Sequence, residues 1–151
     1  MAESGTGGGL EPRQYRLGQT YLGKIPKGAD LAAYLDGLLA DKGIRAGAVG
    51  VIGVLERARL GFYDTGAGKY VVTEVPNHCE IASCLGNISL RDGRAGVHAH
   101  IVVSDAEGRT LGGHLLEGCG VHYAEFWILA FEGQPFERGL DPATNVMGWV
   151  R

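Results

Sequence analysis

The sequence predicts an α+β fold, in which an antiparallel β-sheet is covered by one main helix within a single domain. Three observations support this prediction. Apolar residues recur at helical spacing in one segment, between Asp30 and Gly43. Much of the remaining chain alternates with the period of two that is typical of β-strands. The connections between consecutive expected strands are short, which favours antiparallel pairing.

The expected helix is bounded by residues that favour its two ends. Asp30 is a preferred N-cap, because its side chain can accept a hydrogen bond from a free backbone N–H group of the first turn. Gly43 is a preferred C-terminal stop. A strand expected over residues 15–25 precedes the helix and ends at Pro26-Lys27-Gly28. The apolar residues that should cover one face of the sheet are Leu31, Tyr34, Leu35, Leu38 and Leu39.

The segment after the helix is expected to form a series of strands joined by turns. These strands are 48–55, 58–63, 69–75, 80–90, 95–103, 110–115 and 121–131. The dipeptide Asp92-Gly93 is a strong hairpin signal, since both residues tolerate the backbone angles of a tight two-residue turn. Residues 1–12 are rich in small and polar residues and are expected to form a disordered tail, so that the domain spans residues 13–151.

The composition is ordinary for a globular domain and argues against several classes of protein. Of the 151 residues, 45% are hydrophobic and 21% are charged. The net charge of −3 argues against a strongly basic nucleic-acid-binding protein. No apolar run approaches the ~20 residues of a membrane span, and the Gly-rich N-terminus is unlike a signal peptide. Three cysteines without a C-x-x-C pair favour reduced thiols, so we expect a cytoplasmic protein.

Three of the five histidines fall close together, in segments that are otherwise typical of apolar strands. His98 and His100 are two residues apart, so their side chains point to the same face of a strand, with Cα atoms roughly 6.5–7 Å apart. Both imidazoles could therefore contact one metal ion, and His114 follows in the next expected strand. Neutral imidazole is a good ligand for zinc, iron, nickel or copper.

The position of His114 depends on the turn between these two strands. A four-residue loop after Ser104 would place Ala99 opposite His114, so that His114 would face away from the other two histidines. A five-residue loop would place His100 opposite His114, and all three imidazoles would share one face. Gly108 favours the loop with an odd number of residues, because such hairpins often place glycine at a left-handed position.

Five stretches of the chain, in this order and spacing, match the pattern of a known family. They are Ile44-Arg45-Ala46-Gly47, Ala58-Arg59-Leu60-Gly61-Phe62-Tyr63-Asp64, Leu85-Gly86-Asn87-Ile88-Ser89-Leu90, Val97-His98-Ala99-His100 and Gly112-Gly113-His114-Leu115-Leu116-Glu117-Gly118. Over residues 15–131 the chain resembles the plant and prokaryote conserved (PPC) domain, which is also called the AT-hook-associated domain, in its stand-alone prokaryotic form.

The resemblance implies a compact α+β fold that assembles as a homotrimer. It also implies a metal bound by three histidines, which match His98, His100 and His114. The asparagine of the family's Gly-Asn-Ile-Ser segment matches Asn87, and an upstream acidic position matches Glu80. Plant relatives carry a basic Arg-Gly-Arg-Pro core that enters the minor groove of DNA. This sequence has no such core, so we expect weak DNA binding or none by this chain alone.

Other polar residues give weaker signals. Glu117 is expected to be solvated, whereas Glu125 lies in an apolar strand and needs a partner there, either a metal-binding histidine or another subunit. His78 follows Pro76-Asn77 and is expected to be exposed in a loop. His122 has the parity of Phe126 and Ile128 and is therefore expected in the core or at an interface.

The sequence thus predicts a homotrimeric metal-binding protein whose ion is zinc or another divalent transition metal. Three imidazoles leave one coordination position open, which is typical of catalytic rather than structural sites. The hypothesis is a metalloenzyme with a small-molecule substrate that the sequence does not identify. Glu80 is the candidate general base, and Asn87 a second candidate catalytic residue. The alternative hypothesis is a trimeric scaffold that binds DNA or a protein partner, with a role in transcription.

Overall fold

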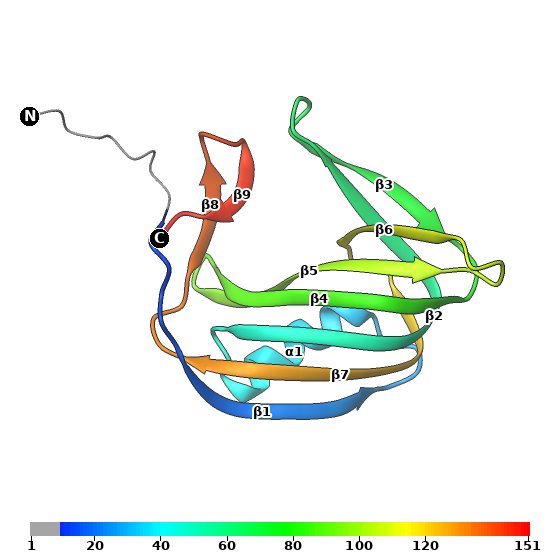
Figure 1. Cartoon of the computed structure of the whole chain (residues 1–151), viewed down its shortest axis with the longest axis horizontal. Coiled ribbons are helices and arrows are strands. Elements are labelled where there is room, and N and C mark those ends of the chain that lie inside the picture. Colours follow the sequence, from blue (N-terminus) through cyan, green and yellow to red (C-terminus); the bar gives the residue numbers. More distant parts are fainter. Residues whose placement is uncertain (1–9) are drawn as a thin grey trace, which may run out of the picture.

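The computed structural model describes residues 10–151, which fold into a nine-stranded sheet with one helix (Figure 1). The disordered tail expected over residues 1–12 therefore falls mostly outside the described residues. In chain order the elements are β1 (Arg16–Ile25), α1 (Leu31–Lys42), β2 (Gly47–Asp64), β3 (Lys69–Val75), β4 (Cys79–Arg91), β5 (Arg94–Ser104), β6 (Thr110–Leu115), β7 (Gly120–Glu132), β8 (Glu137–Asp141) and β9 (Val146–Trp149).

The sheet is organised around the long strand β2. The strand order is β1-β7-β2-β6-β5-β4-β8-β9, with β3 paired to β2 and a further pairing between β2 and β4. The first half of β2 lies between β4 and β7, and its second half pairs with β3 and β6 (Figure 1). Because β2 pairs with both β4 and β6, the sheet curves strongly and brings β5 and β6 alongside the second half of β2.

The helix has the two ends that the sequence predicts. Asp30 is the N-cap and accepts a hydrogen bond from Ala33 N at 3.0 Å. Its other carboxylate oxygen accepts a hydrogen bond from Gly118 N at 2.6 Å, which joins the start of the helix to the segment before β7. Gly43 ends the helix in the left-handed conformation, with φ of 65°.

The core lies between the helix and one face of the sheet. The helix buries Leu31, Leu35 and Leu39 completely, against strand residues such as Val51 and Ile128.

All three cysteines are free and buried, in agreement with the expected reduced thiols. The fold is mostly β-sheet with one helix, consistent with the α+β class. Among the described residues no helix is long and apolar enough to cross a membrane.

Three features of the sheet differ from the sequence prediction. The strands expected over 48–55 and 58–63 form one continuous strand, β2, which is bulged at Glu56 rather than broken there. The hairpin of β8 and β9 was not predicted, although the turn around Asp141-Pro142 is a hairpin signal. The sheet is also not purely antiparallel, because β8 pairs in parallel with the end of β4. This last pairing brings the C-terminal hairpin beside β4.

The N-cap leads to a prediction about stability. Replacing Asp30→Ala removes two hydrogen bonds and should lower the free energy of unfolding by about 1–2 kcal/mol. Urea denaturation followed by circular dichroism measures this change. The control is Asp41→Ala near the other end of the helix, where an acidic side chain opposes the helix dipole and its loss should not destabilise the protein. Equal destabilisation by both variants would contradict the role assigned to Asp30.

Candidate metal centre

The three clustered histidines lie on two neighbouring strands and share one face. His98 and His100 are on β5, and His114 is on β6. The register pairs Ser104 with Thr110 and His100 with His114. This is the register of the five-residue loop, so the predicted convergence of the three side chains is confirmed.

The turn between β5 and β6 explains this register. Gly108 has φ of +77°, a left-handed conformation that favours glycine. Asp105 Oδ1 accepts hydrogen bonds from Glu107 N at 3.0 Å and Arg109 N at 2.9 Å. The guanidinium of Arg109 in turn bonds Asp105 Oδ2 at 2.7 Å. The aspartate and the glycine together therefore hold the turn at five residues.

The geometry of the three imidazoles fits a shared metal ion. The ring centroids of His98 and His114 are 5.0 Å apart, those of His98 and His100 5.3 Å, and those of His100 and His114 5.7 Å. One ligand nitrogen from each ring lies within 4.8 Å of the other two. Zinc binds imidazole nitrogen at about 2.0–2.1 Å, so small side-chain rotations would bring the three nitrogens onto one ion.

The local environment keeps two of these histidines neutral. Burial, together with the positive charge of Arg138, lowers the pKa of His98 to about 4. Burial likewise lowers the pKa of His114, with a contribution from His100. A neutral imidazole carries a lone pair that can bind a metal ion, so neither ring has to lose a proton for this at neutral pH.

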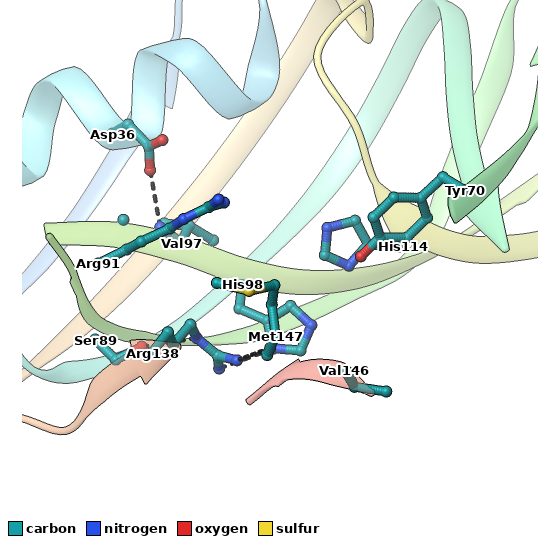
Figure 2. Close-up of a pocket in the computed structure, with 11 residues that line it drawn as sticks. Asp36, Tyr70, Ser89, Arg91, Val97, His98, His114, Arg138, Val146 and Met147 are labelled. Atoms are coloured by element: carbon teal, nitrogen blue, oxygen red, sulfur yellow. Dashed lines mark hydrogen bonds between the residues drawn. The ribbon is translucent and has the colours of Figure 1, made fainter. Parts of the chain in front are cut away.

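Arg138 is a residue at this site that the sequence analysis missed. It reaches the histidines from β8, and its Nη2 lies 3.0 Å from His98 Nδ1 (Figure 2). The same guanidinium donates hydrogen bonds to Asn87 Oδ1 at 2.8 Å and to Ser89 Oγ at 2.9 Å. These partners are all uncharged, and burial lowers the pKa of Arg138. A half-buried cation therefore lies directly beside the candidate metal ligands.

This contact determines the tautomer of His98. A guanidinium can only donate hydrogen bonds, so Nδ1 of His98 accepts and the neutral ring carries its proton on Nε2. A metal ion can use either nitrogen only after this arrangement changes, by release of Arg138 or transfer of the ring proton. Arg138 would thus compete with any metal ion for His98, both through this hydrogen bond and through its positive charge.

The histidines form a boundary between two cavities. A cavity of about 320 Å³ on one side is lined by Asp36, Tyr70, Arg91, His98, His114 and Arg138 (Figure 2). A second cavity, of about 430 Å³, contacts all three histidines together with Phe62 and Tyr63. Asp36 Oδ1 accepts a hydrogen bond from Val97 N at 2.8 Å, which ties helix α1 to β5 next to His98. A small molecule in the first cavity would contact His98, His114 and two guanidinium groups.

The two candidate catalytic residues lie in different places. Asn87 pairs with His98 across β4 and β5 and accepts the hydrogen bond from Arg138, so it belongs to the site. Glu80 does not reach the histidines, because it is exposed at the opposite end of β4 and pairs with Ser104. The register of β4 against β5 shifts between Ile81 and Ser83, close to Glu80 but far from the histidines. This shift therefore does not redirect Glu80 toward the site.

The remaining polar candidates lie outside this centre. Glu117 is exposed, as expected. Glu125 is also exposed, and it accepts a hydrogen bond from Tyr123 Oη at 2.6 Å instead of facing the histidines. His78 is exposed, as predicted. His122 is exposed too, so the core alternative was wrong, whereas the interface alternative stays a prediction. The reason is a bulge in β7, where His122 is an extra residue between Val121 and Tyr123. The bulge interrupts the alternation of the strand, so residues on its two sides no longer share a face according to their spacing.

Comparisons with known proteins agree with this fold. The family model of the Plants and Prokaryotes Conserved domain matches residues 13–132. The chain is 34% identical over 122 residues to the bifunctional protein GlmU of a Synechococcus strain. The match covers 80% of the chain but 18% of that protein, so the chain spans less than a fifth of the relative's length.

Similar solved structures include two archaeal proteins. One is a metal-containing protein from Archaeoglobus fulgidus, with 30% identity and a TM-score of 0.89 over 94% of this chain and 100% of that one. The other is a plant- and prokaryote-conserved protein from Pyrococcus horikoshii, with 30% identity and a TM-score of 0.88 over 94% and 98% of the two chains. A candidate DNA-binding protein from Ralstonia eutropha is 28% identical, with a TM-score of 0.77 over 87% and 92%.

The environment of His98 predicts a pH dependence of stability for the metal-free protein. The folded state holds the pKa of His98 at about 4, below the ~6.5 of an unfolded histidine. The unfolded state therefore takes up this proton first, and the stability present above pH ~6.5 should be lost as pH falls toward about 4.

The measurement is the free energy of unfolding at several pH values, in the presence of a chelator that keeps the protein free of metal. His98→Gln should reduce the slope between pH ~6.5 and ~4, because the titrating group is absent. The matched control, His78→Gln in the exposed loop, should keep the parent slope. The interpretation fails if His98→Gln and the parent protein lose stability at the same rate over this range.

Proposed function

The chain belongs to the Plants and Prokaryotes Conserved domain family, and we propose that it is a metal-binding member whose domain spans residues 13–151. The proposed ligands are His98, His100 and His114, and the proposed ion is zinc or another divalent transition metal. The observation that carries this proposal is the approach of one nitrogen from each ring to within 4.8 Å of the other two. The metal-containing relative from Archaeoglobus fulgidus supports it.

The proposed role of the centre is to bind and activate a small molecule. When bound by three imidazoles, such an ion would lower the pKa of a bound water to ~7 or polarise a carbonyl group. Arg138 and Arg91 line the adjoining cavity, and Asp36 is the one carboxylate among its lining residues. This balance of charge favours an anionic ligand. Asn87 would then act as a positioning residue, because it holds Arg138 through a hydrogen bond.

Glu80 is too far along β4 to serve as general base within one chain. Tyr70 is the titratable side chain with the best placement in the same cavity, since its ring stacks on His114 with centroids 5.0 Å apart. Burial raises the pKa of Tyr70, so its hydroxyl stays protonated at neutral pH and would donate a hydrogen bond to a ligand rather than remove a proton. The proposal therefore assigns no general base to this chain.

We further propose that the protein is a homotrimer in the cytoplasm. The sheet face opposite the helix exposes the apolar side chains of Ile52, Leu85 and Val102, with exposed fractions of 47%, 59% and 39%. Leu85 pairs directly with His100, which is itself exposed. A second subunit on this face would bury the apolar residues and would complete the surroundings of His100.

A DNA-binding scaffold is the second candidate function, and the similarity to a candidate DNA-binding protein favours it. Two basic residues near the N-terminus, Arg13 and Lys27, have partners within the chain, however. Arg13 donates a hydrogen bond to the carbonyl of Pro135 at 2.8 Å and lies over the ring of Phe136. Lys27 lies 3.9 Å from Glu56. The net charge of −3 adds to this argument, since phosphate contacts dominate affinity for DNA.

Metal analysis tests the proposed ligands. Protein purified without chelator should carry zinc or another transition metal, and His98→Ala or His114→Ala should each lose about one equivalent per chain relative to the parent. Elemental analysis of the purified variants measures the metal. The control is Glu80→Gln, which should keep the parent content because Glu80 lies away from the centre. Retention of the full metal content by both histidine variants would show that the assignment is wrong.

The apolar face predicts the oligomeric state. Light scattering at micromolar concentration should give about three times the chain mass of 16.0 kDa. Ile52→Lys should shift the protein toward the monomer, because the new cation would lie in the interface and opposite Glu125 of its own chain. Leu140→Lys, an exposed change on the C-terminal hairpin, is the control and should leave the mass unchanged. A parent protein that is monomeric would refute the proposed assembly.

A further inference from the structure

A second group of side chains that could hold a metal ion lies outside the three-histidine centre. It consists of Glu56, His78 and His122, each of which offers one ligand atom within 4.8 Å of the other two. Glu56 Oε1 and His122 Nδ1 are 3.6 Å apart. The rings of His78 and His122 are nearly perpendicular, at 79°, with centroids 5.2 Å apart.

Two bulges in the sheet bring Glu56 and His122 together. Leu55 pairs with Val121, but the next pairs on either side are Val54 with Tyr123 and Arg57 with Gly120. One extra residue is therefore present in each strand, namely Glu56 in β2 and His122 in β7. A bulged residue leaves the normal alternation of the strand, which redirects its side chain. This explains why neither side chain enters the core that the neighbouring residues line.

The turn before β4 adds His78 to the same place. Leu55 pairs with Cys79 on one side and with Val121 on the other. Glu56, His78 and His122 are the chain neighbours of these three paired residues. Segments that are far apart in the sequence thus meet at one point of the sheet, and each contributes one potential ligand.

This cluster shares no residue with the three-histidine centre, and the two groups lie beside different parts of β2. The β2 residue that pairs with His114 is Gly61, in the second half of the strand, whereas Glu56 lies at the bulge. The side chains of Glu56 and His122 are 34% and 42% exposed, and His78 is exposed as well. A metal ion can therefore reach the second cluster from solvent without any change at the first.

Hydrogen bonding does not account for this cluster, and the ion pairs available to Glu56, with Lys27 and with protonated His122, are solvent-exposed. The 3.6 Å between Glu56 and His122 is too long for a hydrogen bond. Lys27 Nζ lies 3.9 Å from the same carboxylate oxygen, but it is 67% exposed, and such surface pairs add little to stability. Two imidazoles and one carboxylate are, by contrast, a ligand set suited to zinc, nickel or cobalt.

We propose that Glu56, His78 and His122 form a second metal site, which binds a divalent transition metal through two imidazole nitrogens and one carboxylate oxygen. Water would complete the coordination of the ion. The bound metal would link the turn before β4 to the bulges of β2 and β7. It would thereby stabilise the folded chain in proportion to the metal concentration, because the unfolded chain does not bring the three ligands together.

A zinc titration of the full chain, first freed of metal by chelator and dialysis, tests this proposal. Calorimetry should find two equivalents of zinc per chain in the parent protein and one in His78→Ala, His122→Ala or Glu56→Gln. The variant His114→Ala should retain the second site, and His114→Ala combined with His78→Ala should bind none. Asn77→Ala, an exposed change in the same turn, is the matched control and should bind two equivalents.

Thermal unfolding gives an independent readout. Zinc should raise the melting temperature of His114→Ala, and this increase should disappear when His78→Ala is added. The proposal is overturned if His78→Ala, His122→Ala and Glu56→Gln all bind as much zinc as Asn77→Ala. A failure of the three-histidine proposal would look different, since His114→Ala would then bind the same amount as the parent.

Discussion

The five-residue turn between β5 and β6 places His114 on the face that His98 and His100 already share, and the proposed three-histidine centre depends on it. Side chains alternate along a strand, so a turn one residue shorter would place His114 on the opposite face from His100. Asp105 and Gly108 hold the observed length, through three hydrogen bonds to the aspartate side chain and a left-handed glycine. The ligand set thus depends on a surface turn that contacts none of the ligands.

The C-terminal hairpin adds a positive charge to this centre. Arg138 lies beyond residues 13–132, the part of the chain that matches the family. The parallel pairing of β8 with β4 brings the guanidinium of Arg138 into contact with His98 and Asn87. A cation beside a metal site weakens metal binding, but it strengthens the binding of an anion in the adjoining cavity. If the proposed function is correct, the hairpin would therefore lower the affinity for the metal and raise the affinity for an anionic ligand.

Local patterns in the sequence predicted much of the fold and part of the site. The caps Asp30 and Gly43, the hairpin at Asp92-Gly93 and the shared face of His98 and His100 each depend on a few neighbouring residues. The bulges at Glu56 and His122 were missed, because a bulge depends on the partner strand and reverses the expected parity. Arg138 was missed because its contact with His98 joins residues 40 positions apart in the chain. Sequence periodicity carries no information about such contacts.

The central claim is that His98, His100 and His114 bind one metal ion together. X-ray diffraction at the zinc absorption edge, from crystals of zinc-loaded protein, tests this claim most directly. The account predicts an anomalous peak among the three rings, about 2.0–2.1 Å from one nitrogen of each imidazole. Zinc-loaded crystals with no peak at this position, and with Arg138 still hydrogen-bonded to His98, would contradict it.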